Sequence, residues 1–96
     1  MVKHIVMWKV KEGETVENVV AKFNSMLDDL EKVCPLIIER RVGINLNENE
    51  VFDFCIDSLF KDMDDLNEYI YHPVHLKIRE YLTSISCEKA VFDYTF

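Results

Sequence analysis

The sequence lacks any grouping of cysteines that would bind a metal. Its three cysteines, Cys34, Cys55 and Cys87, are widely spaced and form neither a Cys-x-x-Cys pair nor a metal-finger spacing. An odd number of scattered cysteines is typical of reduced thiols that fill a core. We therefore expect a cytoplasmic protein with no zinc site at these positions.

Two further absences bear on the partners of the chain. It shows no signal-peptide pattern and no apolar run near membrane-spanning length. Positive charge is also scarce, because 11 Lys and Arg residues stand against 18 Asp and Glu residues, a net charge of −7. Phosphate backbones and anionic lipids repel such a chain, so neither a nucleic acid nor a membrane is expected as a partner.

Hydrophobic residues are, by contrast, abundant for a chain of this size. A length of 96 residues predicts one domain, spanning residues 1–96, with a modest core. The hydrophobic fraction of 49% is more than such a core is expected to hide alone. This excess indicates a homo-oligomer.

Hydrophobic periodicity predicts the order β-α-β-β-α-β. The expected strands are residues 2–10, 37–44, 51–60 and 89–96, and the expected helices are residues 16–33 and a second helix from residue 62. Thr15 is expected to cap the first helix. Residues 84–88 are expected to form a short connection before the last strand.

This order is typical of an α+β, ferredoxin-like fold, in which two helices cover one face of a four-stranded antiparallel sheet. Alternation in the first strand places His4, Val6 and Trp8 on one face. Ile5 and Met7 lie on the other, so neither face is cleanly polar. Because the helices cover only one face, a second sheet is expected to close a dimeric α/β barrel.

The segment from Glu68 to Leu76 brings two histidines and two tyrosines close to one proline. Pro73 has no N–H and disfavours a helical conformation at the preceding residue. The second helix is therefore expected to break near residues 71–72 and to restart with Pro73 as its first residue. Side chains held at fixed angles beside such a break are candidates for a site.

Each candidate residue also has a purely structural explanation. His75 can act as a general base, or it can tie the helix to the sheet by one hydrogen bond. Tyr69 can pack in the core with its hydroxyl hydrogen-bonded, and His4 can be a satisfied core histidine. His72 can simply cap the restarted helix, and Asp93 could orient the His75 imidazole.

A metal site built from His72, His75 and nearby acids is conceivable, since residues three apart share a helix face. The proline break disturbs that geometry, so we expect no metal. Magnesium held by loop oxygens cannot be recognised from sequence.

Three stretches together resemble the stress-responsive dimeric α/β-barrel family: Val2-Lys-His-Ile-Val at the start, Tyr69-x-x-His72-Pro73-x-His75 after the second helix, and the closing Val91-Phe-Asp-Tyr94. The resemblance covers essentially the whole chain. It implies a dimer of two ferredoxin-like sheets, and most members of this family have no assigned reaction.

One plant member of that family is a polyketide cyclase that closes a linear substrate by an intramolecular aldol condensation without a cofactor. By resemblance, its catalytic pair matches Tyr69 and His75, and a histidine of its pocket matches His4. Imidazole suits removal of an α-proton, and a phenol can hold an enolate oxygen. Phe54 aligns with a polar pocket residue of that cyclase, and with Phe52 it would shrink the cavity.

These observations predict a homodimer that binds a small, partly apolar ligand without a cofactor. The candidate catalytic residues are His75 and Tyr69, and the candidate ligand-binding residues are His4, His72, Phe54, Trp8 and Asp93. One alternative is a cofactor-independent, cyclase-like enzyme with His75 as general base and Tyr69 positioning an oxygen. Another is a structural dimer whose cavity is plugged by Phe52 and Phe54.

Overall fold

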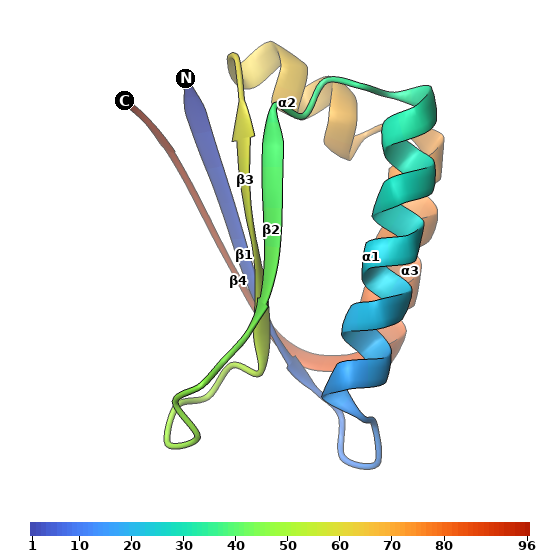
Figure 1. The fold of residues 1–96 in the computed structure, drawn as a ribbon, viewed down its shortest axis with the longest axis vertical. Helices are drawn as coiled ribbons and strands as arrows, with labels where there is room; N and C mark the ends of the chain where they lie inside the picture. The colour runs from blue at the N-terminus through green and yellow to red at the C-terminus, as the bar shows by residue number, and fades with distance from the viewer.

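A four-stranded antiparallel sheet carries all three helices on one side, and its opposite side carries none (Figure 1). The computed structural model describes residues 1–96. In chain order the elements are β1 (Val2–Val10), α1 (Val16–Val33), β2 (Glu39–Ile44), β3 (Phe54–Phe60), α2 (Met63–Ile70), α3 (Pro73–Ile85) and β4 (Ser86–Thr95). The strand order β2-β3-β1-β4 is that of a ferredoxin-like fold, as predicted.

The sequence predicted the bounds of β1 and α1 and the helix break at Pro73. The predicted connection over residues 84–88 is wrong, because β4 begins at Ser86 directly after α3. Ile85 is buried in the core and Ser86 already pairs with Val10, so both residues belong to regular structure. Thr15 occupies the N-cap position of α1, but its side chain makes no capping hydrogen bond.

Two strand starts also differ from the prediction. β2 begins at Glu39, two residues later than predicted, and β3 begins at Phe54 instead of residue 51. Before β3, a carboxylate oxygen of Asp53 accepts the Val10 N–H at 2.8 Å. A side chain therefore takes the place of a strand carbonyl at this point.

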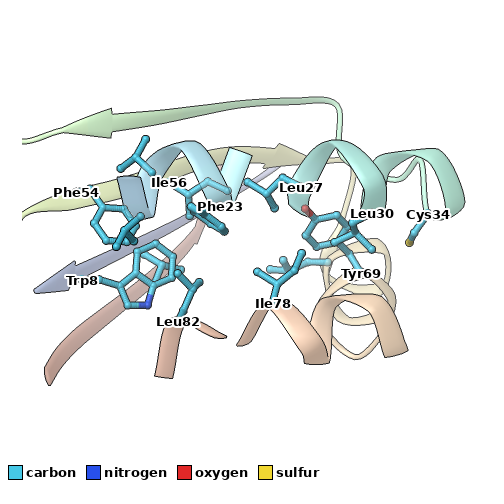
Figure 2. Packing of buried hydrophobic residues seen from close by; sticks show 14 of the residues in the cluster. Trp8, Phe23, Leu27, Leu30, Cys34, Phe54, Ile56, Tyr69, Ile78 and Leu82 are labelled. Atoms are coloured by element: carbon cyan, nitrogen blue, oxygen red, sulfur yellow. The ribbon is translucent and has the colours of Figure 1, made fainter. Parts of the chain in front are cut away.

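The core lies between the helices and the covered face of the sheet. At one end, Trp8 stacks on Phe54 with ring centroids 5.0 Å apart, and Phe23 meets Trp8 edge-on at 5.3 Å (Figure 2). At the other end, the rings of Phe60 and Tyr69 are 5.1 Å apart. Such offset and edge-on pairs add to the stabilisation from burial alone.

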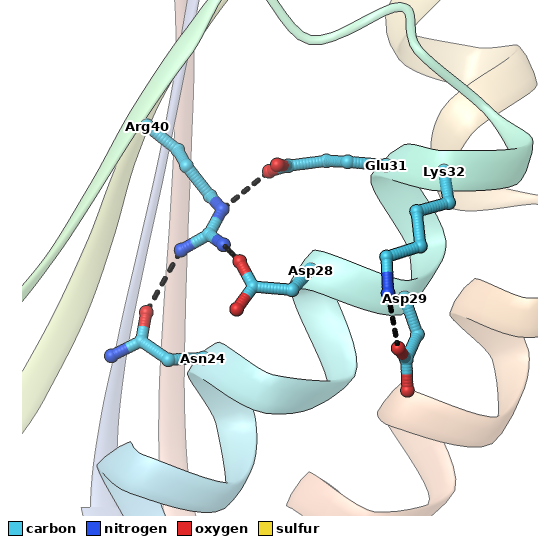
Figure 3. Close-up of polar contacts among 6 residues, drawn as sticks. All are labelled: Asn24, Asp28, Asp29, Glu31, Lys32 and Arg40. Atoms are coloured by element: carbon cyan, nitrogen blue, oxygen red, sulfur yellow. Dashed lines mark hydrogen bonds and ion pairs between the residues drawn. The ribbon is translucent and has the colours of Figure 1, made fainter.

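Arg40 joins β2 to α1 through three acceptors on successive turns of the helix (Figure 3). Its guanidinium donates to Asn24 Oδ1 at 2.8 Å, to Asp28 Oδ1 at 2.5 Å, and to Glu31 Oε1. The side chain of Arg40 is only 14% exposed, so these partners satisfy a largely buried charge. The contacts hold α1 against the edge of the sheet.

The side of the sheet without helices carries a group of apolar side chains beside the Lys3–Asp57 ion pair. Register pairs Ile5 with Phe92 and Met7 with Ala90, and these residues point away from the helices. Phe92 is 64% exposed and Tyr94 43% exposed, with ring centroids 5.9 Å apart. We call this surface the open face and define it by five residues: Ile5, Met7, Leu59, Phe92 and Tyr94. A single chain therefore buries only one face of its sheet.

No helix of the structure has the length and apolar character needed to cross a membrane.

Candidate functional site

The break between α2 and α3 fixes the start of α3. Asp62 caps α2 by accepting the Asp65 N–H at 2.9 Å, and α2 ends at Ile70. His72 is the N-cap of α3, and its Nδ1 accepts the Val74 N–H at 3.1 Å. Pro73 then stands at the first helical position, where its missing N–H costs nothing. His72 therefore has the capping role that was one of its two interpretations.

A cavity of about 140 Å³ lies between α3 and strands β1 and β4 and reaches inward to α1 and β3. It opens to solvent, and its wall combines apolar and polar side chains. The residues that line it are His4, Val6, Trp8, Phe23, Leu27, Ile56, Ser58, Tyr69, Ile70, His75, Arg79, Leu82, Thr83, Ser86, Lys89, Val91 and Asp93. Five of the seven predicted site residues are among them.

His75 lies in the first turn of α3 and lines this cavity. Its Nδ1 is buried and forms no hydrogen bond of normal geometry, although the Ile70 backbone lies close enough to raise the His75 pKa slightly. Burial lowers the pKa of His75 to about 4, and the neighbouring side chains of His4, Arg79 and Lys89 contribute to the lowering. The imidazole is therefore neutral at physiological pH and can accept a hydrogen bond or a proton from a ligand.

Tyr69 lies near the end of α2, with its ring edge-on to that of His75 and the two centroids 5.3 Å apart. In Figure 2 its hydroxyl points toward α1 at the level of Leu27, which also lines the cavity. The hydroxyl is buried and has no hydrogen-bond partner. Burial raises the pKa of Tyr69 far above its ordinary value, and the Glu31 carboxylate raises it further. The hydroxyl therefore stays protonated and available as a donor.

His4 and Asp93 form a hydrogen-bonded pair across the cavity wall, where β1 and β4 place them directly opposite each other. The hypothesis that Asp93 orients His75 is therefore wrong, because the Asp93 carboxylate is engaged by His4. Ser58 supports this arrangement from β3, since its Oγ donates to the backbone carbonyl of His4 at 3.0 Å. His4 is thus a half-buried histidine with a partner.

Two predicted ligand-binding residues are not brought to this cavity. His72 is used as the cap of α3. Phe54 packs against Trp8 and Phe23 in the core and lines a separate small hollow near Gly43 together with Phe52. Because neither phenylalanine lines the cavity, they do not plug it.

Sequence reasoning missed two cationic residues of the cavity wall, Arg79 and Lys89. Signals for both were present. Arg79 follows His75 by four residues and so shares its face of the helix. Lys89 alternates with Val91 and Asp93 along β4 and is paired with Trp8.

The structure gathers no three His, Cys, Asp or Glu side chains that could hold a metal ion. Its three cysteines are free, and none lines the cavity. The chemistry available at the site is therefore that of a neutral imidazole, a phenol, a histidine–carboxylate pair and two cations.

Fold and site together define a protein whose sheet and helices enclose a His- and Tyr-lined cavity. Residues 2–96 match the family described as the stress responsive A/B barrel domain. The chain belongs to this family.

Individual relatives differ in what is known of them. Olivetolic acid cyclase from Cannabis sativa is 25% identical over 97 residues, which cover 98% of this chain and 95% of the cyclase. A dimeric protein of unknown function from Bacteroides fragilis, with a ferredoxin-like fold, is 31% identical. The match to it has a TM-score of 0.79 and covers 99% of this chain and 95% of that protein.

A hydroxynitrile lyase from Passiflora edulis shares the fold, with a TM-score of 0.82 at 20% identity. That match covers 99% of this chain and 95% of the lyase. At this level of identity the similarity concerns the fold alone.

Proposed function

We propose that this protein binds a small, partly apolar molecule in the cavity between α3 and strands β1 and β4. The supporting observation is that a cavity open to solvent is lined by His75 and Tyr69, and that each of these side chains has a buried polar atom without a hydrogen-bond partner. Buried polar groups are normally hydrogen-bonded, and an unpaired one is costly. A ligand with a carbonyl or hydroxyl group would supply the missing partner.

The size of the cavity limits the apolar part of this ligand. Its volume of about 140 Å³ is close to that of an apolar cavity of roughly 150 Å³ known to bind benzene. Trp8, Phe23 and Leu82 supply apolar wall. A body of about one aromatic ring, carrying an oxygen function, matches both the volume and the wall.

Binding of phenylacetamide, a neutral probe of this size, tests the proposal through the fluorescence of Trp8, the only tryptophan. We expect saturable binding with a Kd of about 1 mM or tighter. Val91→Phe adds a ring at the cavity wall and should weaken binding about tenfold. Val33→Phe, at the exposed end of α1, is the matched control and should leave the Kd unchanged.

If the unmodified protein binds no probe, or if Val91→Phe binds as well as Val33→Phe, the ligand proposal is contradicted. A structural dimer without a ligand would then be the better description.

A second function, catalysis of proton abstraction and aldol closure, is favoured by the unpaired atoms of Tyr69 and His75 in one cavity and by the identity to olivetolic acid cyclase. In this reaction His75 would take the α-proton between two carbonyl groups. The Tyr69 hydroxyl would donate a hydrogen bond to the enolate oxygen. The resulting carbanion would attack a carbonyl group farther along the same chain, and the attacked oxygen would receive the proton.

Catalysis ranks second because of the proton affinity of His75. A base with a pKa of about 4 is weak, and a general base works best with a pKa near the operating pH. The only carboxylate in the cavity wall, that of Asp93, is bonded to His4 and so does not stabilise a His75 imidazolium. A bound substrate would have to supply that stabilisation.

Turnover of a linear poly-β-keto thioester, followed by mass spectrometry of the cyclised product, tests this second function. His75→Ala should abolish turnover while leaving the thermal unfolding midpoint nearly unchanged. Leu76→Ala, on the next position of the same helix, should retain activity. If His75→Ala loses stability and activity to the same extent, the loss of activity is explained by unfolding, and His75 is not supported as the base.

A homodimer formed through the open face completes the proposal. The support is the exposure of Phe92 and Tyr94 on the open face and the dimeric state described for the Bacteroides fragilis relative. Apolar patches of this kind commonly mark interfaces between protein chains. Two sheets meeting there would form a barrel with the helices outside, and each cavity would remain open on the helix side.

A further inference from the structure

Two cations stand at the wall of the cavity without an acidic partner. Arg79 reaches it from α3, and Lys89 reaches it from β4. Neither forms an ion pair within the chain, a property they share with other lysines and arginines of its surface, but these two line the cavity. Their charges are close enough to interact, because the pKa of Lys89 is lowered by burial and, in addition, by the charge of Arg79.

The acids near this pair are used elsewhere or point away. Asp93, the only carboxylate in the cavity wall, is bonded to His4. Glu88 precedes Lys89 and so points to the other face of β4, where it lies opposite Lys9 in the register of the two strands. The cavity is thus a positively charged concavity in a chain of net charge −7. Walls of low dielectric strengthen the field inside such a hollow.

We propose that Arg79 and Lys89 bind the carboxylate of the molecule that occupies this cavity. The inference rests on the proposed binding function and narrows its ligand to an aromatic or similarly compact acid. The planar guanidinium of Arg79 can hold a carboxylate by two parallel hydrogen bonds, and the Lys89 ammonium adds a third donor. The apolar body of the ligand would then lie inward, against Trp8 and Leu82.

This orientation of the ligand matches the positions of the polar groups, with the cations at the mouth of the cavity and the neutral groups in its interior. The cations are on exposed residues near the solvent side of the cavity, whereas Tyr69 is buried in its interior. His75 lies one helical turn from Arg79. An acid with a carbonyl or hydroxyl group beyond its ring would place its charge at the mouth and its neutral oxygen near His75 or Tyr69.

Phenylacetate and phenylacetamide, which differ only in the charged group, test the proposal on the full-length protein at low ionic strength. We expect phenylacetate to bind about tenfold more tightly, and added salt to reduce this preference. The double variant Arg79→Gln/Lys89→Gln should bind both probes with the affinity that the unmodified protein has for phenylacetamide. Lys77→Gln, on the same helix but outside the cavity wall, is the control and should keep the preference.

The outcomes separate this inference from the function on which it rests. Equal affinity for the two probes in the unmodified protein would overturn the carboxylate assignment and leave the cavity proposal standing. If Arg79→Gln/Lys89→Gln still binds phenylacetate more tightly than phenylacetamide, the assignment is also overturned, because other groups would then bind the carboxylate. Failure of both probes to bind would contradict the cavity proposal itself, and the carboxylate assignment with it.

Discussion

A buried imidazole makes the stability of this protein depend on pH. His75 is buried beside three other groups that can carry positive charge, and its pKa falls from 6.5 to about 4. Between these two values the unfolded chain binds a proton that the folded chain does not bind. The stabilisation is therefore complete above about pH 6.5 and is lost as the pH falls toward 4.

This difference predicts a loss of at most about 3 kcal/mol in the free energy of unfolding between pH 6.5 and pH 4. Urea denaturation at a series of pH values, at one protein concentration, measures it. In His75→Gln this part of the pH dependence should disappear, whereas Leu76→Ala carries no titratable change and should retain it. The same slope in both variants would show that other groups cause the acid sensitivity.

At the scale of helices and strands, Pro73 determines how the site is built. The proline ends α2 and starts α3 in a new direction, so that Tyr69 at the end of one helix meets His75 at the start of the next. Its effect could be predicted from sequence because it follows from covalent geometry, namely a fixed φ and a missing N–H. His72 caps α3 at the same break, and this role could also be predicted from sequence.

Contacts between distant segments could not be predicted in the same way. That Asp93 pairs with His4 and not with His75 follows from the register of β4 against β1, which alternation alone leaves open. Phe54 was expected in the pocket because it aligns with a pocket residue of the plant cyclase, yet Trp8 and Phe23 draw it into the core. That Arg79 and Lys89 line one cavity depends on how α3 packs against β4, and this tertiary contact cannot be predicted from the local sequence.

The clamp between Arg40 and α1 illustrates the same limit at the edge of the sheet. From sequence, a charged residue in an edge strand is explained by the need to prevent aggregation. In the structure Arg40 instead holds three acceptors of α1, on the side that carries the helices (Figure 3). This contact holds α1 next to β2 at one edge of the sheet, whereas the cavity lies next to β4 at the opposite edge.

For the molecule as a whole, the distribution of apolar surface argues for association through the sheet. The covered face of the sheet is closed by helices, but the open face leaves Phe92 64% exposed next to Tyr94. Leaving such side chains in water forgoes a favourable free energy of about 25 cal/mol for each Å² that could be buried. Burial against the same face of a second chain recovers it, and the cavity on the other side of the sheet is unaffected.

Light scattering at micromolar concentration should therefore give a mass twice the 11.4 kDa of one chain. Phe92→Glu places a charge on the open face, and because burying an unpaired charge is costly it should shift the mass to that of a monomer. Val33→Glu adds the same charge at the exposed end of α1 and should leave the dimer intact. A monomeric unmodified protein, or a dimeric Phe92→Glu variant, would place the interface elsewhere or remove it. If the monomer variant still binds phenylacetamide, each chain carries a complete cavity and dimerisation serves to bury the sheet.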